Sequence, residues 1–162
     1  MKAVGYQKTL PVDHAQALVD IELPEPVAQG RDLLVEVRAV SVNPVDTKVR
    51  RGMAPAEGEW RVLGWDAAGI VRATGPDVTL FKPGDRVWYA GSIARPGSNS
   101  ELQLVDERIV GTGGGADALV RAEVDVARVG RVYGNRLDLH ILRQAQGDSL
   151  PAASVRLDAI EP

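Results

Sequence analysis

Metal and thiol chemistry depend on cysteine and histidine, and this 162-residue sequence offers almost none of either. It contains no cysteine and two histidines, His14 and His140, which lie far apart in the chain. A tetrahedral zinc site is built from cysteine sulfurs and histidine nitrogens, so these residues cannot assemble one. The lack of cysteine also excludes a disulfide scaffold and thiolate catalysis, and it fits the reducing cytoplasm, where we expect the protein.

Nucleotide chemistry has a formal candidate in 111-GTGGGA-116. The stretch fits the G-x-G-x-x-G/A pattern, follows an apolar strand, and Asp138 lies at about the distance expected of a ribose-binding carboxylate. Only 46 residues follow Ala116 (162 − 116), too few for a sheet of βαβ units of about 30 residues each. They alternate with period 2, whereas a phosphate-binding helix needs period 3.6. We therefore interpret 111–116 as a Gly-rich connector.

Alternation of apolar and polar residues predicts a mainly β protein. Strands are expected at 2–6, 17–23, 32–42, 66–73, 85–90 and 101–106. Pro44 opens a short helix over 44–51, which Gly52 ends. Many short strands separated by Gly/Pro turns, with one or two short helices, indicate a partly open or closed β-barrel.

Two short segments explain how the strands turn and cross. The small residues 67–69 (Ala-Ala-Gly) let one strand approach another closely. In the turn 82–85 (Lys-Pro-Gly-Asp), Pro83 fixes φ and Gly84 accepts a positive φ.

The composition changes near residue 110, which predicts one domain over 1–110 and a tail over 111–162. The tail has six arginines and no lysine, and apolar residues alternate around residues 120–126 and 137–141. We expect a hairpin within 118–142, in a tail that is β-leaning or disordered.

Charge and hydropathy exclude several classes of partner. A net charge of −3 without a Lys/Arg cluster argues against nucleic-acid binding. No apolar run approaches the ~18–20 residues of a membrane span, and the N-terminus lacks the apolar core of a signal peptide.

Four blocks in a fixed order suggest a known family. They are MKAVGY at 1–6, EVRAVSVNPVDTKVRRG at 36–52, GWDAAGIV with FKPGDRV at 64–71 and 81–87, and GSNSELQLVDERIVG at 97–111. Together they resemble the GroES-like catalytic domain of the medium-chain dehydrogenase/reductase superfamily, most of all its quinone-oxidoreductase and zinc-type alcohol-dehydrogenase-like branch. This family places NAD(P) on a separate Rossmann domain after the barrel, which we expect the chain to lack.

The resemblance also assigns roles to residues. Asn43 and Trp65 stand where the zinc enzymes have a cysteine and a histidine ligand, and Asp66 stands where they have a glutamate, so no zinc is expected. Asn43 would be a catalytic residue facing the nicotinamide and the substrate. Asp46, also in the catalytic set, would fix the strand–helix junction.

Three further residues are substrate-binding candidates. Lys48 sits where many relatives have tyrosine, Arg50 matches an arginine common in the quinone branch, and Trp65 would form a pocket wall. Simpler interpretations stay open: Asn43 as a turn residue, Asp46 as a first-turn carboxylate, Lys48 and Arg50 as solvated charges, and Trp65 as core packing.

The resulting hypothesis is the catalytic-domain portion of a zinc-independent, NADPH-dependent quinone or enone reductase, inactive on its own without a Rossmann domain. NADPH would be the family's cofactor but would not be bound by this chain alone. The alternative is a non-catalytic barrel that acts as an interaction or oligomerisation module. Barrel surface left uncovered predicts self-association.

Overall fold

A computed structural model describes residues 1–112 of the chain. The predicted hairpin at 118–142, the connector residues 113–116 and both Asp138 and His140 lie outside the described residues. The division of the chain at residue 110 stays a prediction.

The described part is mainly β, as expected. The elements in order are β1 (Lys2–Tyr6), β2 (Val19–Glu22), β3 (Asp32–Ser41), α1 (Pro44–Gly52), β4 (Arg61–Val62), β5 (Asp66–Thr74), β6 (Arg86–Ala90), β7 (Leu102–Asp106), a 3-10 turn (Glu107–Ile109) and β8 (Val110–Thr112). No helix within residues 1–112 is long and apolar enough to cross a membrane.

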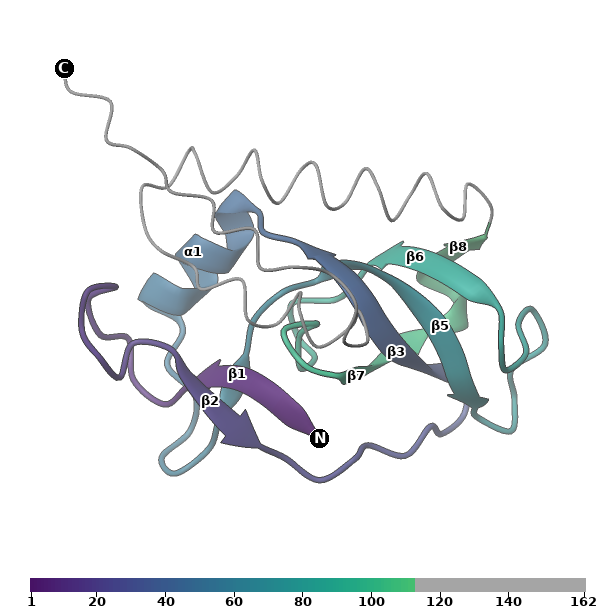
Figure 1. Ribbon diagram of the computed structural model, residues 1–162, viewed down its shortest axis with the longest axis horizontal. Helices are drawn as coiled ribbons and strands as arrows, with labels where there is room; N and C mark the ends of the chain where they lie inside the picture. The colour runs from purple at the N-terminus through teal and green to yellow at the C-terminus, as the bar shows by residue number, and fades with distance from the viewer. Residues whose placement is uncertain (113–162) are drawn as a thin grey trace, which may run out of the picture.

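The strands form two antiparallel sheets. The short sheet has the order β2-β1-β4, and the long sheet has the order β7-β3-β5-β6-β8. Figure 1 shows the short sheet beneath α1 on one side of the molecule and β5, β6 and β8 on the other. The isolated bridge between Ala3 and Ser100 links the region of β1 to the segment before β7. The expected partly open barrel is therefore confirmed.

The core follows from the alternation in β3. Leu33, Val35 and Val37 are buried on one face, while the residues between them are half-exposed. They pack with Val40 of the same strand and with residues of β5, β6 and β7: Ala67, Val71, Val87, Tyr89 and Val105. A second buried cluster joins α1 to the short sheet and contains Tyr6, Val49, Leu63 and Trp65.

Gly69 confirms the expected close strand crossing. A Cβ built on Gly69 would lie 2.1 Å from the carbonyl oxygen of Glu36 on β3. Beside this contact, the pairing of β3 and β5 shifts register between Val37 and Ala39. The bulge increases the local twist, which curves the long sheet toward a barrel.

β8 begins at Val110 and extends into the stretch 111–116 that we interpreted as a connector. Gly111 and Thr112 pair with Trp88 and Val87 on β6. Gly111 lacks a side chain for a packing reason, since a Cβ there would lie 2.6 Å from the Trp88 indole. The first two residues of GTGGGA thus belong to the long sheet.

Candidate functional site

The turn into α1 carries the first predicted site residues. Asn43 is the N-cap, with extended backbone angles, and Pro44 follows in the first turn. The Asn43 main-chain N–H donates to Asp46 Oδ2 at 2.7 Å, and the Asp46 N–H donates to the Asn43 carbonyl at 3.0 Å. Both residues therefore shape the start of the helix, as the turn-residue and first-turn interpretations required.

Asp46 also reaches across to the segment before β5. Its Oδ1 accepts a hydrogen bond from the Gly64 main-chain N–H at 2.9 Å, and the residue is only 5% exposed. Gly64 has a φ of +91°, which favours glycine. This contact fixes the position of Gly64 relative to α1, and with it the positions of Trp65 and Asp66, which follow in the chain.

Asp66 completes the cluster and was absent from the predicted site residues. The Asn43 side-chain amide donates to Asp66 Oδ2, and more weakly to the Ser41 carbonyl at 3.4 Å. The other Asp66 oxygen, Oδ1, has no hydrogen-bond partner among residues 1–112. The sequence held a signal for Asp66, because it stands where the zinc enzymes have an acidic residue. Asn43 thus connects two carboxylates, one through its main chain and one through its side chain.

Burial changes the acidity of both carboxylates. It raises the pKa of Asp46, against the lowering effect of the N–H groups of Asn43 and Gly64, and the charge of Asp66 raises it further. Burial also raises the pKa of Asp66, and the hydrogen bond from Asn43 opposes this shift. The pair therefore holds protons more tightly than exposed aspartates would.

Trp65 lies in the core rather than on an open wall. It is 3% exposed and packs with Tyr6, Val49 and Leu63. Its indole Nε1–H donates to the Arg95 carbonyl at 3.3 Å. The structure thus shows the packing that the simpler interpretation of Trp65 described, while a role in substrate contact stays a prediction.

Lys48 and Arg50 have opposite environments. Lys48 is exposed on α1. Arg50 is buried, and its Nη1 donates to the Leu10 carbonyl at 2.7 Å, which ties the loop after β1 to the helix. Arg50 is therefore not a solvated charge, contrary to one of the two interpretations above.

The zinc that the family's name implies can be tested against these residues. Asn43 donates its amide to Asp66, and the Trp65 indole fills a buried cluster without offering an unprotonated nitrogen. Within residues 1–112 no group of three or more His, Cys, Asp or Glu side chains could hold a metal ion. The residues present do not fit zinc.

Two of the hollows in the described part are sizeable, and neither is lined by Asn43, Asp46 or Asp66. One of about 810 Å³ lies between the short sheet and β3, and one of about 510 Å³ lies beside Arg95, next to the carbonyl that accepts from Trp65. We place the candidate site at the hydrogen-bonded cluster because its chemistry, rather than the depth of the surface, singles it out.

A family comparison decides the classification. The sequence profile described as "Alcohol dehydrogenase GroES-like domain" matches residues 29–131. The chain belongs to the alcohol dehydrogenase GroES-like domain family. The expected membership of the medium-chain dehydrogenase/reductase superfamily is thereby confirmed.

Curated relatives of this GroES-like chain carry two kinds of name. A zinc-type alcohol dehydrogenase-like protein of Staphylococcus aureus (strain COL) is 49% identical over 113 residues, which are 68% of this chain and 32% of the relative. A quinone oxidoreductase of Pseudomonas aeruginosa (strain PAO1) is 42% identical over 95 residues, which are 57% of this chain and 29% of the relative. The chain spans about a third of the length of these relatives.

Solved structures show the same GroES-like fold. A protein of Rhizobium etli CFN 42, named for the zinc-dependent alcohol dehydrogenases, matches with 62% identity and a TM-score of 0.68, over 74% of this chain and 36% of its own. The Escherichia coli quinone oxidoreductase, solved in complex with NADPH, matches with 27% identity and a TM-score of 0.63, over 75% and 36%.

Proposed function

We propose that this chain forms the acceptor-side domain of a zinc-independent, NADPH-dependent quinone or enone reductase. Family membership supports the oxidoreductase class. The observation that carries the zinc-independent assignment is the Asn43–Asp66 hydrogen bond beside the buried Trp65. Asn43 and Asp66 bind each other and Trp65 is packed in the core, so these three residues do not provide the ligands of a zinc ion.

In this proposal the side chains act on the acceptor. When NADPH is bound to the whole reductase, it supplies hydride, and a quinone or an activated alkene accepts hydride without a metal. Asn43 gives the acceptor oxygen the amide N–H that otherwise donates weakly to the Ser41 carbonyl, while Asp66 orients the amide by accepting its other N–H. Asp46 positions both residues, because it binds Asn43 and Gly64 from the first turn of α1.

The described start of the glycine-rich stretch, Gly111 and Thr112, does not fit a dinucleotide phosphate. A pyrophosphate needs free N–H groups in a turn that leads into a helix, whereas Gly111 and Thr112 pair with β6 in a sheet. No step of the proposal therefore depends on a nucleotide bound by these residues, and we propose that the 162-residue chain alone has little or no turnover.

The test combines zinc content with ligand binding. After incubation with Zn²⁺ and dialysis, we expect far less than one zinc per chain by elemental mass spectrometry, and a stoichiometric content would overturn zinc independence.

Phenanthrenequinone should quench tryptophan fluorescence saturably, and Asn43→Ala should weaken this binding about tenfold, a difference of about 1.4 kcal/mol. The exposed Gln29→Ala is the control. Unchanged binding in Asn43→Ala would remove Asn43 from the site, and ordinary turnover with NADPH by the pure chain would refute its inactivity.

A second candidate function is self-association through β8. Trp88 (49% exposed) on β6 and Ile109 (46% exposed) just before β8 lie next to this edge strand, which among residues 1–112 pairs only with β6. Edge strands and exposed apolar side chains both favour pairing with another chain. Light scattering after size exclusion should show a dimer that Trp88→Ser weakens and Trp60→Ser, on the short-sheet side, does not. A monomer at all concentrations would exclude this function.

A further inference from the structure

One carboxylate oxygen of Asp66 has no use in the function proposed above. Asp66 Oδ2 accepts the side-chain amide of Asn43, while Oδ1 has no hydrogen-bond partner among residues 1–112. Asp66 is half-buried at the start of β5, and the residues that pair with it there, Ser41 on β3 and Ala90 on β6, are uncharged. Since half-buried polar atoms normally have a partner, Oδ1 is an oxygen that a ligand can use.

The two carboxylates of the site lie close together without a cation. The ion pairs within residues 1–112 include neither Asp46 nor Asp66, although Asn43 is bonded to both. Burial raises the pKa of Asp46, and the charge of Asp66 raises it further. Two carboxylates in such an arrangement do not ionise independently, so the pair holds a proton more tightly than a single carboxylate would.

The hydrogen bonds indicate which carboxyl group holds that proton. N–H donors favour the ionised form of a carboxylate. Asp46 accepts the main-chain N–H of Asn43 on one oxygen and that of Gly64 on the other, so a proton on either oxygen would compete with a donor. Asp66 accepts one amide N–H, on Oδ2, which leaves Oδ1 as the oxygen that can carry the proton. Burial raises the pKa of Asp66 against this single hydrogen bond.

The Asn43 amide brings a second donor to the same place, because its nitrogen is bonded to the carboxyl group that contains Oδ1. The other N–H of this amide donates only weakly, to the Ser41 carbonyl at 3.4 Å. One carbonyl oxygen has two lone pairs and can accept both donors. We propose that the carbonyl oxygen of the quinone or enone binds between the Asn43 N–H and an O–H on Asp66 Oδ1. This inference rests on the proposed function, and it adds to Asp66 a direct contact with the acceptor, where two donors would stabilise negative charge that develops on the oxygen.

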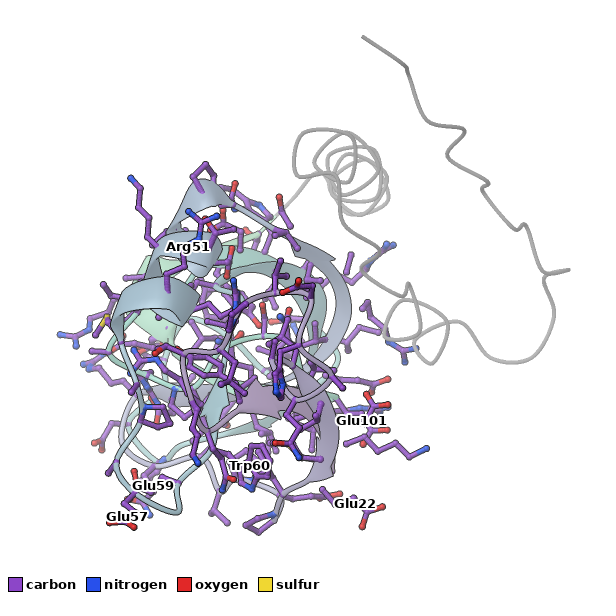
Figure 2. All side chains as sticks on the ribbon, turned by 90° about the vertical axis from the view of Figure 1, so that its left-hand side faces the viewer. Glu22, Arg51, Glu57, Glu59, Trp60 and Glu101 are labelled. Carbon is purple, nitrogen blue, oxygen red and sulfur yellow. The ribbon has the colours of Figure 1, made fainter. Side chains whose placement is uncertain are left out.

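The O–H donor predicts that quinone binding depends on pH. In calorimetric titrations of the full chain with phenanthrenequinone between about pH 5 and 8, Kd should be constant below the folded pKa of Asp66 and rise by up to about tenfold per pH unit above it. In Asp66→Asn an amide N–H replaces the O–H and cannot ionise, so Kd should stay within about twofold across the range. The exposed Glu59→Gln is the matched control and should keep the wild-type profile, since Figure 2 shows Glu59 at the lower end of the molecule, away from α1.

Proton uptake gives a second readout of the same contact. In buffers that differ in ionisation enthalpy, the wild type should take up close to one proton per bound quinone above the folded pKa of Asp66, and Asp66→Asn should take up none. Thermal melting at each pH establishes that the variants are folded.

Three outcomes would overturn the O–H donor. A wild-type Kd that is constant with pH would do so while quinone binding, and with it the proposed function, stands. The same pH dependence in Asp66→Asn would assign the titration to another group, such as Asp46. If the wild type binds no quinone at any pH, the proposed function itself fails, and this inference fails with it.

Discussion

The carboxylate of Asp46 accepts a hydrogen bond from the main-chain N–H of Gly64 at 2.9 Å, across 18 residues of sequence. The other oxygen of the same carboxylate accepts the Asn43 N–H at 2.7 Å. One buried side chain therefore holds the first turn of α1 against the residue that precedes Trp65 and Asp66. The relative placement of Asn43 and Asp66 depends on it.

Removal of this carboxylate should destabilise the domain. In Asp46→Ala, the N–H groups of Asn43 and Gly64 both lose their acceptor in a buried place. We expect the free energy of unfolding to fall by about 2–4 kcal/mol, measured by urea unfolding at pH 7. Asp46→Asn keeps one acceptor oxygen and should lie between Asp46→Ala and the wild type. An Asp46→Ala variant as stable as the wild type would mean that water satisfies both groups.

Two glycines with the same backbone angle allow the cost of a side chain at positive φ to be separated from the cost of a steric clash. Gly64 and Gly84 have φ values of +91° and +92°. A Cβ on Gly84 would meet nothing within 4 Å, but on Gly64 it would lie 2.6 Å from Ser98 Oγ and from Asn99 Oδ1. Gly84→Ala should cost only the left-handed strain of about 1–2 kcal/mol. Gly64→Ala should cost more and should also weaken quinone binding, as read by thermal melting and fluorescence. Equal losses in melting temperature would contradict the crowding argument.

The long strands were predictable because each buries one face. Strand 32–42 was expected and β3 is Asp32–Ser41, since alternation over ten residues leaves little freedom of register. β4 was missed because Arg61–Val62 is too short for any period to appear. β8 was missed because Gly111 interrupts the alternation of apolar and polar residues. The glycine is required there by the Trp88 indole, which lies on another strand and so gives no local signal.

The site was predictable only in part. Asn43 and Asp46 could be placed at the helix start, because an N-cap and a first-turn carboxylate have local signals. The contact of Asp46 with Gly64 could not be predicted, since it depends on how α1 packs against the segment before β5. The burial of Arg50, a predicted substrate-binding candidate, could not be foreseen for the same reason, because its partner is the carbonyl of Leu10, 40 residues earlier.

A second matched pair tests the buried hydroxyls. Ser98 is 0% exposed, and its Oγ has no hydrogen-bond partner among the described residues. Ser98→Ala should therefore leave stability unchanged or raise it, because nothing is lost except an unsatisfied group. Ser100 Oγ donates to the Leu102 carbonyl at 2.9 Å, so Ser100→Ala should cost about 1 kcal/mol. Urea unfolding of both variants decides the matter, and a destabilised Ser98→Ala would reveal a partner for that hydroxyl.

Glu107 makes the stability of the fold depend on pH. Its burial would raise the pKa of the carboxyl, but the N–H groups of Leu80 and Thr79, at 2.8 and 3.0 Å, and the Arg31 guanidinium, at 2.6 Å, outweigh burial and lower it. The folded pKa thus lies below the ordinary 4.5, so the folded chain binds fewer protons than the unfolded chain. This contribution is fully present above the unfolded value and is lost as the pH falls through the folded pKa.

The variant Glu107→Gln isolates the effect, because an amide resembles the protonated acid and cannot ionise. We expect the wild type to exceed it in free energy of unfolding at pH 7 and the difference to shrink steadily as the pH falls below about 4.5. Urea unfolding of the wild type and of Glu107→Gln across this pH range measures the difference. N–H donors stabilise an ionised carboxylate more than a protonated one. A difference in free energy of unfolding between the wild type and Glu107→Gln that stays constant with pH would therefore contradict the lowered pKa of Glu107.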